Sequence, residues 1–556
     1  MQLTRGIRVA ASATAWCRLK FFSRIVVCLF SAIASACSKS EKSAASGTPT
    51  TSAAQILRIS QRNEPSDLDP ATATLPDEFF ILRALSEGLL IPDPAGGAPL
   101  PAAAANYDVS ADGLIYTFHL RPEATWSDGS RVTAADFLST YRRILTPGTA
   151  APKAHLFDAV KNARAFLTGV VTDFSTVGFA APTPLTFVVT LAQPSPRFPY
   201  YVASGPWLPV NSRAVAQHGR TWTQPGHFVG NGPFTLTEWR QQQRIVVKKN
   251  PRYRATATVQ LDEIQFIRLD SGDTEERAYR AGQVDVTMSV PFTKIESYQR
   301  DRPAEIHRAP LAETRYLSFN TQRPPLNDAR VRRALALAID RQKIVERITR
   351  GGQTPAKNFC PVPIDTPLLL EPSIWAPRLD PPLAARFLAE AGFLGGKNFP
   401  RCELTAWSPS QVPVLEALQA MWREHLGIEV TIAIREAKIH LSALAAGTYD
   451  IAFVTTLVDV ADATAVLSEF TTGAPGNYPH WSDAEYDARL ARLMATRDPG
   501  ARATLQAQAD EHLLREAVVA PLYLNTRTWL MSPRVHGWSE DAFWSRHYHG
   551  VRMEAK

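Results

Sequence analysis

Residues 114–137 hold the most informative stretch of the chain, which reads Leu114-Ile-Tyr-Thr-Phe-His-Leu-Arg-Pro-Glu-Ala-Thr-Trp-Ser-Asp-Gly-Ser-Arg-Val-Thr-Ala-Ala-Asp-Phe137. Apolar and polar side chains alternate from Leu114 to Leu120, which predicts a strand with one buried face. Asp-Gly is a strong turn signal, so a turn is expected at Ser127-Asp-Gly129. The stretch belongs to a region, residues 101–225, whose pattern is richer in strands than the rest of the chain.

Short apolar runs and amphipathic segments alternate along the chain on both sides of this region. Ile56–Ser60 alternates like a half-buried strand, and residues 77–90 carry an apolar stripe at helical spacing. The clearest helix is expected at residues 328–350, capped by Asn327. Residues 403–434 read as strand, helix and strand. This alternation is typical of an α/β protein.

Further elements and two boundaries follow from the same patterns. The run Pro92-Asp-Pro-Ala-Gly-Gly-Ala-Pro99 is dense in residues that break regular structure, and the strand pattern restarts after Pro225. Both positions are candidate domain boundaries. Other strands are expected at residues 185–191, 244–249, 261–268, 449–455 and 518–524, and other helices at residues 274–281 and 483–515.

The first 36 residues have the pattern of an export signal. They contain five Lys and Arg residues and no acid, and they end in an apolar run of about 12 residues from Ile25 to Ala36. Ala34-Ser-Ala-Cys37 resembles a bacterial lipobox, which implies that Cys37 becomes a lipidated first residue. Residues 37–54 are then a polar, flexible tether. The alternative is a plain signal peptide that is cut nearby.

Composition limits the partners of the mature chain. The sequence has 60 Lys and Arg against 53 Asp and Glu, and removing the five leader cations leaves 55 against 53. A nearly neutral chain without a long basic run indicates no nucleic-acid partner. About 520 mature residues predict two or three domains, and no later stretch is apolar enough to span a membrane.

The sequence contains no recognisable catalytic or metal-binding motif. GxSxG, HExxH, the SxxK and KTG pair and the P-loop are all absent, so we expect no enzyme activity, metal or cofactor. His547 and His549 form the only close histidine pair and have no acidic residues at ligand spacing. Cys360 and Cys402 remain after the leader is removed, and whether they form a disulfide is left open.

Residues 116–137 look like the signature of the bacterial extracellular solute-binding proteins, family 5, which are the peptide-binding subunits of ABC importers. Other segments resemble the same family in the same order along the chain. These segments are Glu64–Pro70, Glu87–Leu89, Trp222–Gly226, Gly230–Phe234 and Asn320–Ala334. Because the matches run from about residue 56 to the last strand, the resemblance covers nearly all of the mature chain.

The resemblance implies a two-lobed periplasmic-binding-protein fold of type II, with a β-rich domain inserted in the first lobe. The first lobe is expected to comprise residues 55–97, 226–317 and 520–556, the inserted domain residues 98–225, and the second lobe residues 318–519. The family captures short peptides by hinge closure and delivers them to a permease and an ATPase. We therefore expect an exported, lipid-anchored monomer.

The resemblance also implies where a peptide would bind. In the family, the strand before the long helix offers an edge to which a peptide adds as an extra strand; here it is residues 314–320, including Arg315, Tyr316, Leu317 and Ser318. The acid that meets the peptide ammonium corresponds to Asp459. Asp462 competes for this role. Thr456 and Leu457 precede the acid, and Thr74, Leu75, Pro76 and Tyr523 match other positions that face the cleft.

Two departures from the family concern the opposite end of the ligand. Thr455 and Thr456 replace the Gly-Trp pair that often precedes the acid. Leu444 and Phe453 stand where some members have basic residues that meet a ligand carboxylate, so Arg315 or Lys153 would have to replace them. The alternatives therefore stay open: a non-peptide ligand such as a nickel chelate, an opine-like conjugate or a sugar, an envelope chaperone, or an exported hydrolase.

Overall fold

The computed structural model describes residues 54–95, 97–361, 374–456, 458, 460, 462–496 and 498–554. All of them fall in one compact unit, Ala53–Lys556. The predicted leader, Cys37 and most of the predicted tether lie outside the described residues. No helix within the described ranges has the length and apolarity that a membrane crossing requires.

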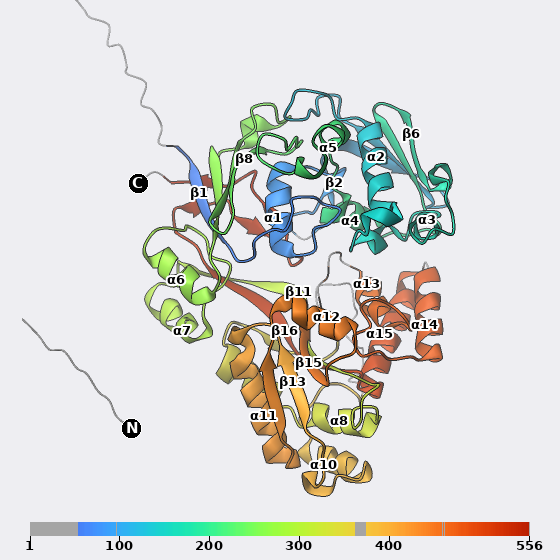
Figure 1. The fold of residues 1–556 in the computed structure, drawn as a ribbon, viewed down its shortest axis with the longest axis vertical. Helices are drawn as coiled ribbons and strands as arrows, with labels where there is room; N and C mark the ends of the chain where they lie inside the picture. Colours follow the sequence, from blue (N-terminus) through green and yellow to red (C-terminus); the bar gives the residue numbers. More distant parts are fainter. Residues whose placement is uncertain are drawn as a thin grey trace, which may run out of the picture. The chain divides into compact units, whose positions relative to one another are not determined.

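One half of this unit contains two four-stranded sheets (Figure 1). The first sheet has the order β1-β10-β9-β8, with β1 (Ile56–Gln61) parallel to β10 (Glu263–Arg268). The hairpin β8 (Phe234–Arg240) and β9 (Arg244–Lys249) completes it, as the sequence predicts. Helix α1 (Pro76–Leu85) packs its apolar face on this sheet.

The second sheet is antiparallel and lies within residues 98–225. Its order is β4-β5-β7-β6, from β4 (Ala104–Val109), β5 (Ile115–Leu120), β7 (Thr186–Thr190) and β6 (Phe179–Thr183). The expected strand at residues 114–120 and the turn at Ser127-Asp-Gly129 are confirmed, and Gly129 adopts the positive φ of +89° that favours glycine. We call the two four-stranded sheets and their helices the first half.

Helix α2 (Ala134–Leu145) covers the antiparallel sheet, and its start explains part of the opening motif. The amide and hydroxyl of Thr133 both donate to Asp136 Oδ2, at 2.8 and 2.9 Å. The first of these bonds satisfies the Thr133 amide, a backbone donor that the start of a helix leaves without a partner. Phe137 and Trp126 are then buried in the core between helix and sheet.

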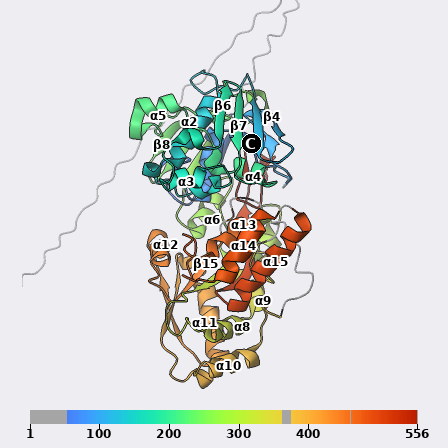
Figure 2. The same cartoon turned by 90° about the vertical axis from the view of Figure 1, so that its right-hand side faces the viewer.

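The second half is built on a six-stranded sheet. Its order is β12-β16-β11-β15-β13-β14. The bounds are β12 (Thr354–Pro355), β16 (Val519–Leu530), β11 (Ile306–Phe319), β15 (Ile451–Thr455), β13 (Cys402–Ala406) and β14 (Val430–Ile434). Its two faces carry separate cores, one under α8, α10 and α11 and the other under α13, α14 and α15. Figure 2 shows the second group of helices together.

The remaining helices and short strands are as follows. The helices are α3 (Ala163–Leu167), α4 (Phe198–Val202), α5 (Ser212–His218), α6 (Gly272–Arg280), α7 (Phe292–Asp301), α8 (Ala329–Leu337), α9 (Arg341–Lys343), α10 (Pro381–Glu390), α11 (Val412–Leu426), α12 (Ala437–Ala445), α13 (Ala463–Leu467), α14 (Ala484–Ala495) and α15 (Pro499–Glu516). The short strands are β2 (Leu90–Ile91), β3 (Leu100–Pro101), β17 (Val535–His536), β18 (Ser539–Glu540), β19 (Arg546–His547) and β20 (Arg552–Met553).

Strands β11 and β16 belong to the second half, whereas the expected boundaries assign most of their residues to the first lobe. The prediction assigns residues up to 317 and from 520 onward to the first lobe, yet β11 and β16 are hydrogen-bonded into the six-stranded sheet. Their far ends reach the first half, where Met531 bridges Val286 and Val286 bridges Ile59. Both strands therefore serve the two halves, because each is long enough to leave one sheet and meet the other.

The helix predicted over residues 328–350 is interrupted. Helix α8 ends at Leu337, and α9 and a π-helical turn at Ile344–Thr349 follow. Asp328, rather than Asn327, caps α8, and Asp340 caps the next segment by accepting from Lys343 N at 2.9 Å. A second capping carboxylate within the apolar pattern favours a new helix start there.

Cys360 and Cys402 are both buried and unbonded. They belong to the cores on opposite faces of the six-stranded sheet, so the sheet separates them. Burial raises the pKa of both thiols, that of Cys402 to about 12, which leaves them protonated at neutral pH. The open question of a disulfide is therefore answered by two free thiols.

Candidate functional site

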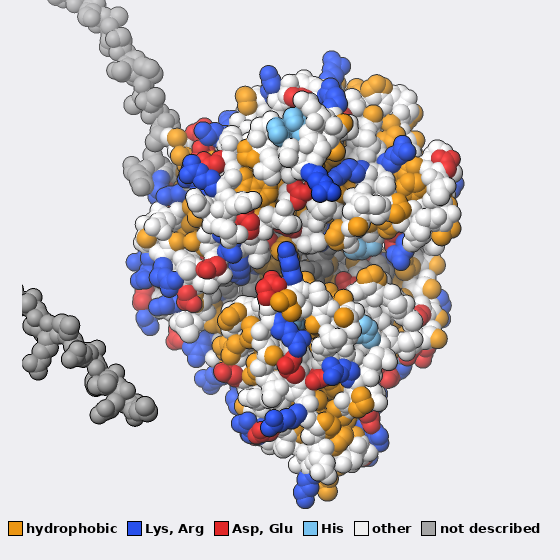
Figure 3. Space-filling view, viewed as in Figure 1, with side chains coloured by type: hydrophobic (Ala, Val, Ile, Leu, Met, Phe, Trp, Pro, Cys, Tyr) orange, Lys and Arg blue, Asp and Glu red, His pale blue; other side chains and the backbone are white. Residues whose placement is uncertain are grey.

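The carboxyl ends of three parallel strands meet at one edge of the six-stranded sheet. β13 pairs in parallel with both β14 and β15, so Ala406, Ile434 and Thr455 end at the same edge. In open α/β sheets, ligands bind outside these strand ends. Figure 3 shows a hollow that crosses this face of the molecule between the two halves. The edge and the hollow together mark the candidate site.

Arg315 is the cation held beside these strand ends. It pairs with Thr455 in the β11–β15 register, and its Cζ lies 5.2 Å from the ring centroid of Trp407 and 5.9 Å from that of Phe453. Its side chain is 17% exposed, and Nη1 is buried without a hydrogen-bond partner among the described residues. The guanidinium is thus fixed on two aromatic rings and keeps unused donor capacity.

Glu313 orients this guanidinium. Its Oε1 lies 3.3 Å from Arg315 Nη2 and also accepts from the Thr455 hydroxyl, while Oε2 accepts from Asn525 Nδ2 at 2.7 Å. Glu313 is almost fully buried, so its negative charge is satisfied inside the protein rather than offered to a ligand. We refer to Glu313, Arg315, Trp407, Phe453 and Tyr523 as the Arg315 cluster.

Tyr523 stands opposite Arg315 in the β11–β16 register and is buried. Burial raises the pKa of its hydroxyl to about 12, the charge of Arg315 opposes this rise, and Glu313 adds to it. The hydroxyl therefore stays protonated at neutral pH and keeps a proton to donate. Tyr523 adds a neutral polar group to a cluster whose Arg315 and Glu313 charges offset each other.

His440 lies next to the Arg315 cluster on α12. Its ring centroid is 5.6 Å from that of Trp407, and the residue is 1% exposed. Neither ring nitrogen has a hydrogen-bond partner among the described residues. Burial lowers the pKa of His440 to about 4, with a smaller contribution from Arg435. The imidazole is therefore neutral at physiological pH and offers one donor and one acceptor.

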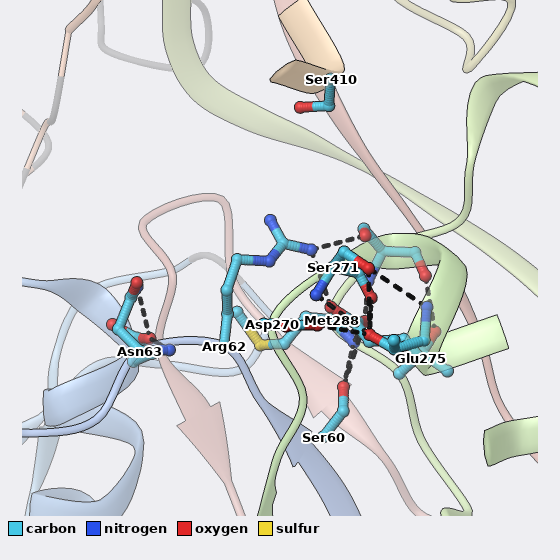
Figure 4. Close-up of polar contacts among 12 residues, drawn as sticks. Ser60, Arg62, Asn63, Asp270, Ser271, Glu275, Met288 and Ser410 are labelled. Atoms are coloured by element: carbon cyan, nitrogen blue, oxygen red, sulfur yellow. Dashed lines mark hydrogen bonds and ion pairs between the residues drawn. The ribbon is translucent and has the colours of Figure 1, made fainter. Parts of the chain in front are cut away.

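The first half presents a second cation toward the same region. Arg62 follows β1, and its Nη2 donates to Glu275 Oε1 at 2.8 Å and to Ser289 Oγ at 2.6 Å. Its side chain is 39% exposed. Figure 4 shows Arg62 between this network and Ser410, which precedes α11 in the second half. Arg62 thus lies on the wall that faces the second half.

The buried Glu275 carboxylate anchors this wall. Its Oε2 accepts from the amides of Met288 and Ser289, at 2.7 and 2.9 Å, and from Ser60 Oγ at 3.1 Å. Figure 4 shows these contacts gathered on one side of Arg62. Glu275 and Ser289 therefore hold one terminal nitrogen of Arg62, Nη2, and Figure 4 shows the other terminal nitrogen pointing away from this network.

Comparison with protein families matches residues 98–478 to the bacterial extracellular solute-binding proteins, family 5 Middle. This match covers more than half of the chain. The chain belongs to this family. Among curated relatives, the periplasmic oligopeptide-binding protein OppA of Escherichia coli is 31% identical over 492 residues, covering 87% of this chain and 90% of OppA. The probable deoxycholate-binding periplasmic protein YgiS of Escherichia coli is 32% identical over 493 residues, with the same coverage.

Solved structures of family 5 proteins share the fold. The murein tripeptide binding protein MppA of Escherichia coli is 29% identical with a TM-score of 0.83, covering 90% of this chain and 99% of MppA. The unliganded open form of MppA gives a TM-score of 0.70 at the same identity, covering 90% and 98%. The arrangement of the two halves is therefore nearer to the first MppA structure than to the open form.

The prediction that β11 offers a free edge to a peptide is wrong. From Arg315 to Phe319, β11 pairs with β15 on one side and with β16 on the other. Tyr316, Leu317 and Ser318 are also buried, so neither their backbone nor their side chains face the hollow. The alternating pattern revealed a strand but not its neighbours. Arg315 alone of this set lies at the candidate site.

The family 5 loop at Thr74, Leu75 and Pro76 has its amides occupied. Glu78 Oε2 accepts from Thr74 N at 2.7 Å and from Leu75 N at 2.9 Å, as α1 begins at Pro76. Thr74 is exposed and Leu75 is half-buried. The Leu75 carbonyl in turn accepts from the Glu78 amide at 3.1 Å, so the exposed side chain of Thr74 is the part of this loop left for a ligand.

The expected ammonium anchor cannot be placed. Asp459 and Leu457 lie outside the described residues, and so does the proposed lipid-bearing Cys37. Thr456 is buried and pairs with Thr314, whose amide donates to Thr456 Oγ1 at 2.9 Å. Asp462, the competitor for the anchor, is engaged inside the protein: it caps α13 and accepts from Arg502 and Tyr201.

Several site residues carry no signal that sequence patterns can reveal. Trp407, His440 and Arg62 come from separate elements, and only the fold brings Trp407 to Arg315. Lys153, the other proposed cation, lies over Phe79, with Nζ 5.6 Å from the ring centroid. Within the described ranges, no group of three His, Cys, Asp or Glu residues could hold a metal ion.

Proposed function

We propose that this chain is the substrate-binding subunit of an ABC importer and that it encloses a short peptide between its two halves. Membership of family 5 and the names of OppA and MppA support a peptide ligand. The observation that carries the proposal is the Arg315 guanidinium, held at the carboxyl ends of β13 and β15 with donor capacity unused. No bond is made or broken in this function.

The proposed binding mode uses both ends of a peptide. Arg315, on its aromatic support, takes the anionic end, because a guanidinium matches the two oxygens of a carboxylate. Arg62 adds positive charge from the opposite wall. By resemblance, Asp459 meets the ammonium. Closing the halves excludes water, which strengthens these charged contacts.

A second candidate ligand is a carboxylated molecule that is not a peptide. YgiS, at 32% identity, is named a probable deoxycholate-binding protein, and Arg315 would hold the carboxylate of such a molecule as well as that of a peptide. No observation favours a nickel chelate, an opine-like conjugate, a sugar or a chaperone substrate over these two. We favour a peptide ligand because OppA and MppA are both named as peptide-binding proteins.

The proposal includes the cellular setting. We propose export by residues 1–36, attachment through a lipid on Cys37 and action as a monomer beside a permease and an ATPase. The two halves correspond to two lobes, with residues 98–225 inserted in the first. Radiolabelled palmitate in cells tests the anchor, since a Cys37→Ala variant would lose the label.

Native mass spectrometry of the protein purified from detergent-solubilised membranes tests the ligand. We expect a set of bound masses that differ by amino-acid residue masses. A single bound mass that does not fit any peptide would favour the carboxylated small molecule. If the protein carries no ligand and a tripeptide library gives no binding by calorimetry, the peptide proposal is wrong.

A further inference from the structure

Asp462 joins three structural elements through one carboxylate. Its Oδ1 caps α13 by accepting from the amide of Thr464 at 3.0 Å, and it also accepts from Arg502 Nη2 on α15 at 2.9 Å. Its Oδ2 accepts from the hydroxyl of Tyr201 at 3.2 Å. The residue is 8% exposed, so these bonds form largely away from water.

Tyr201 comes from the opposite half. It lies on α4 within residues 98–225, 261 positions from Asp462 in sequence. Burial and the nearby charge of Asp462 raise the pKa of the Tyr201 hydroxyl, so it stays protonated and acts as the donor. Figures 1 and 2 show α4 at the edge of the first half that faces the second, and α13 at the facing edge of the second half. The bond therefore spans the two halves.

This bond lies away from the strands that connect the halves. β11 and β16 are continuous segments of the chain, so they connect the halves covalently whatever the angle between the halves. The Tyr201–Asp462 bond has no such covalent support, and it forms only when α4 and α13 are adjacent. The TM-score to the open form of MppA is 0.70, lower than the 0.83 to the other MppA structure, which agrees with an arrangement in which the halves are in contact.

The bond also adjoins the segment expected to hold the ligand. Thr456, at the start of that segment, is fixed by two hydrogen bonds with Thr314. Asp462, at its end, is fixed by Arg502 and Tyr201. Residues 457–461 between them include Asp459. Asp462 thus connects the contact between the halves to the end of the segment whose sequence contains the expected anchor.

We propose that the Tyr201–Asp462 bond is a closure contact that holds the two halves together, with Arg502 as the residue that positions Asp462 for it. Residues 98–225 are therefore not a passive insertion, because they supply the donor that keeps the ligand enclosed. The contact does not depend on which ligand is bound.

The test compares Tyr201→Phe with Tyr200→Phe. Tyr200 neighbours Tyr201 on the same helix and stacks on Arg197, so it is a matched control. Spin labels go on cysteines at Val170 and Met494, which are 80% and 57% exposed and lie in opposite halves. Cys360 and Cys402 are buried and do not compete for the label. In the ligand-free protein we expect Tyr201→Phe to increase the long-distance population severalfold, and Tyr200→Phe to leave it as in the wild type.

Kinetics with trialanine provide the second readout. Loss of a hydrogen bond made only in the closed arrangement should raise the dissociation rate about tenfold, equal to about 1.4 kcal/mol, and leave the association rate within about twofold. Arg502→Gln should raise the dissociation rate as well, without a change in the association rate.

The outcomes separate this inference from the proposed function. Wild-type distances in Tyr201→Phe would overturn the closure contact, even if trialanine binds. If trialanine binds none of the proteins, that result argues against the peptide proposal. The distance measurement still tests the closure contact, because it uses the ligand-free protein. An equal rise in dissociation rate for Tyr200→Phe would also overturn it, because the effect would then belong to α4 as a whole.

Discussion

Arg315 illustrates how a single residue acquires a role from its surroundings. On a bare strand its guanidinium would be solvated and mobile, whereas here Trp407 and Phe453 support it and Glu313 fixes its rotation. Because this side chain is already ordered, binding a ligand to it costs less conformational entropy. In the proposed binding mode, Arg315 would therefore owe part of its affinity for a carboxylate to these three neighbours.

The first prediction concerns this side chain. Arg315→Gln should weaken binding of peptides with a free carboxyl terminus by about 10- to 100-fold, because a hydrogen bond to a charged group contributes about 1.5–3 kcal/mol. Peptides with an amidated carboxyl terminus should bind both proteins alike. Calorimetry with matched acid and amide peptides measures the difference.

Arg330→Gln is the control for this experiment, since Arg330 is an exposed arginine paired with Asp328. It should bind both peptide forms like the wild type. Equal losses for acid and amide peptides in Arg315→Gln would show that Arg315 supports the structure and does not meet the carboxylate.

The second prediction concerns His440 and pH. Its folded-state pKa of about 4 lies below the unfolded value of about 6.5, so protons bind preferentially to the unfolded chain. Stability linked to this group is complete above pH 6.5 and is lost as the pH falls toward 4, by about 3 kcal/mol. His440→Phe keeps a ring of similar size beside Trp407 and removes the titration.

Urea unfolding between pH 7 and pH 4 checks this effect. The free energy of unfolding of His440→Phe should rise relative to the wild type by about 3 kcal/mol across that window. Parallel pH curves for the two proteins would contradict the assignment, since other titrating groups affect both proteins equally.

At the scale of elements, β11 is the most consequential strand. It is central in the six-stranded sheet, and Leu317 on it is fully buried under α8 and α11. The third prediction follows: Leu317→Ala should lower the free energy of unfolding by about 2–5 kcal/mol. Arg308→Ala, on the exposed part of the same strand, should change it by less than about 0.5 kcal/mol. Chemical denaturation measures both, and similar small losses would place Leu317 outside the core.

The sequence predicted elements better than it predicted their neighbours. Alternation located β1, β5 and β7 because each presents one face to a core. The same alternation could not reveal that β11 is paired on both sides, since hydrogen bonding along a strand leaves no trace in side-chain pattern. The expectation of a free edge at Tyr316–Ser318 failed for this reason.

The candidate site was predictable only in part. Arg315 was named from its position before the long helix, yet the residues that support it are distant in sequence. The pairing of β13 with β15 brings Trp407 and Phe453 close together, and the packing of α12 places His440 beside Trp407. Residues scattered over more than 100 positions meet through tertiary structure, which local periodicity does not encode.

At the scale of the whole molecule, binding and closure are coupled. A ligand that binds only the folded, closed protein stabilises it by mass action. The fourth prediction is that trialanine at about 100 times its dissociation constant raises the free energy of unfolding by about 2.7 kcal/mol. The radius of gyration in X-ray scattering should fall at the same time, because the halves approach one another. Stabilisation without compaction would argue against hinge closure.

The placement of β16 between β12 and β11 has a consequence for biosynthesis. Residues 519–530 are the last strand of this sheet to be made, although they fill its interior, so β11 has an open side until Leu530 has been synthesised. A nascent chain that stops short of Leu530 would expose a long unpaired strand prone to association with other chains. The second half can thus reach its native state only after residues 519–530 have been made.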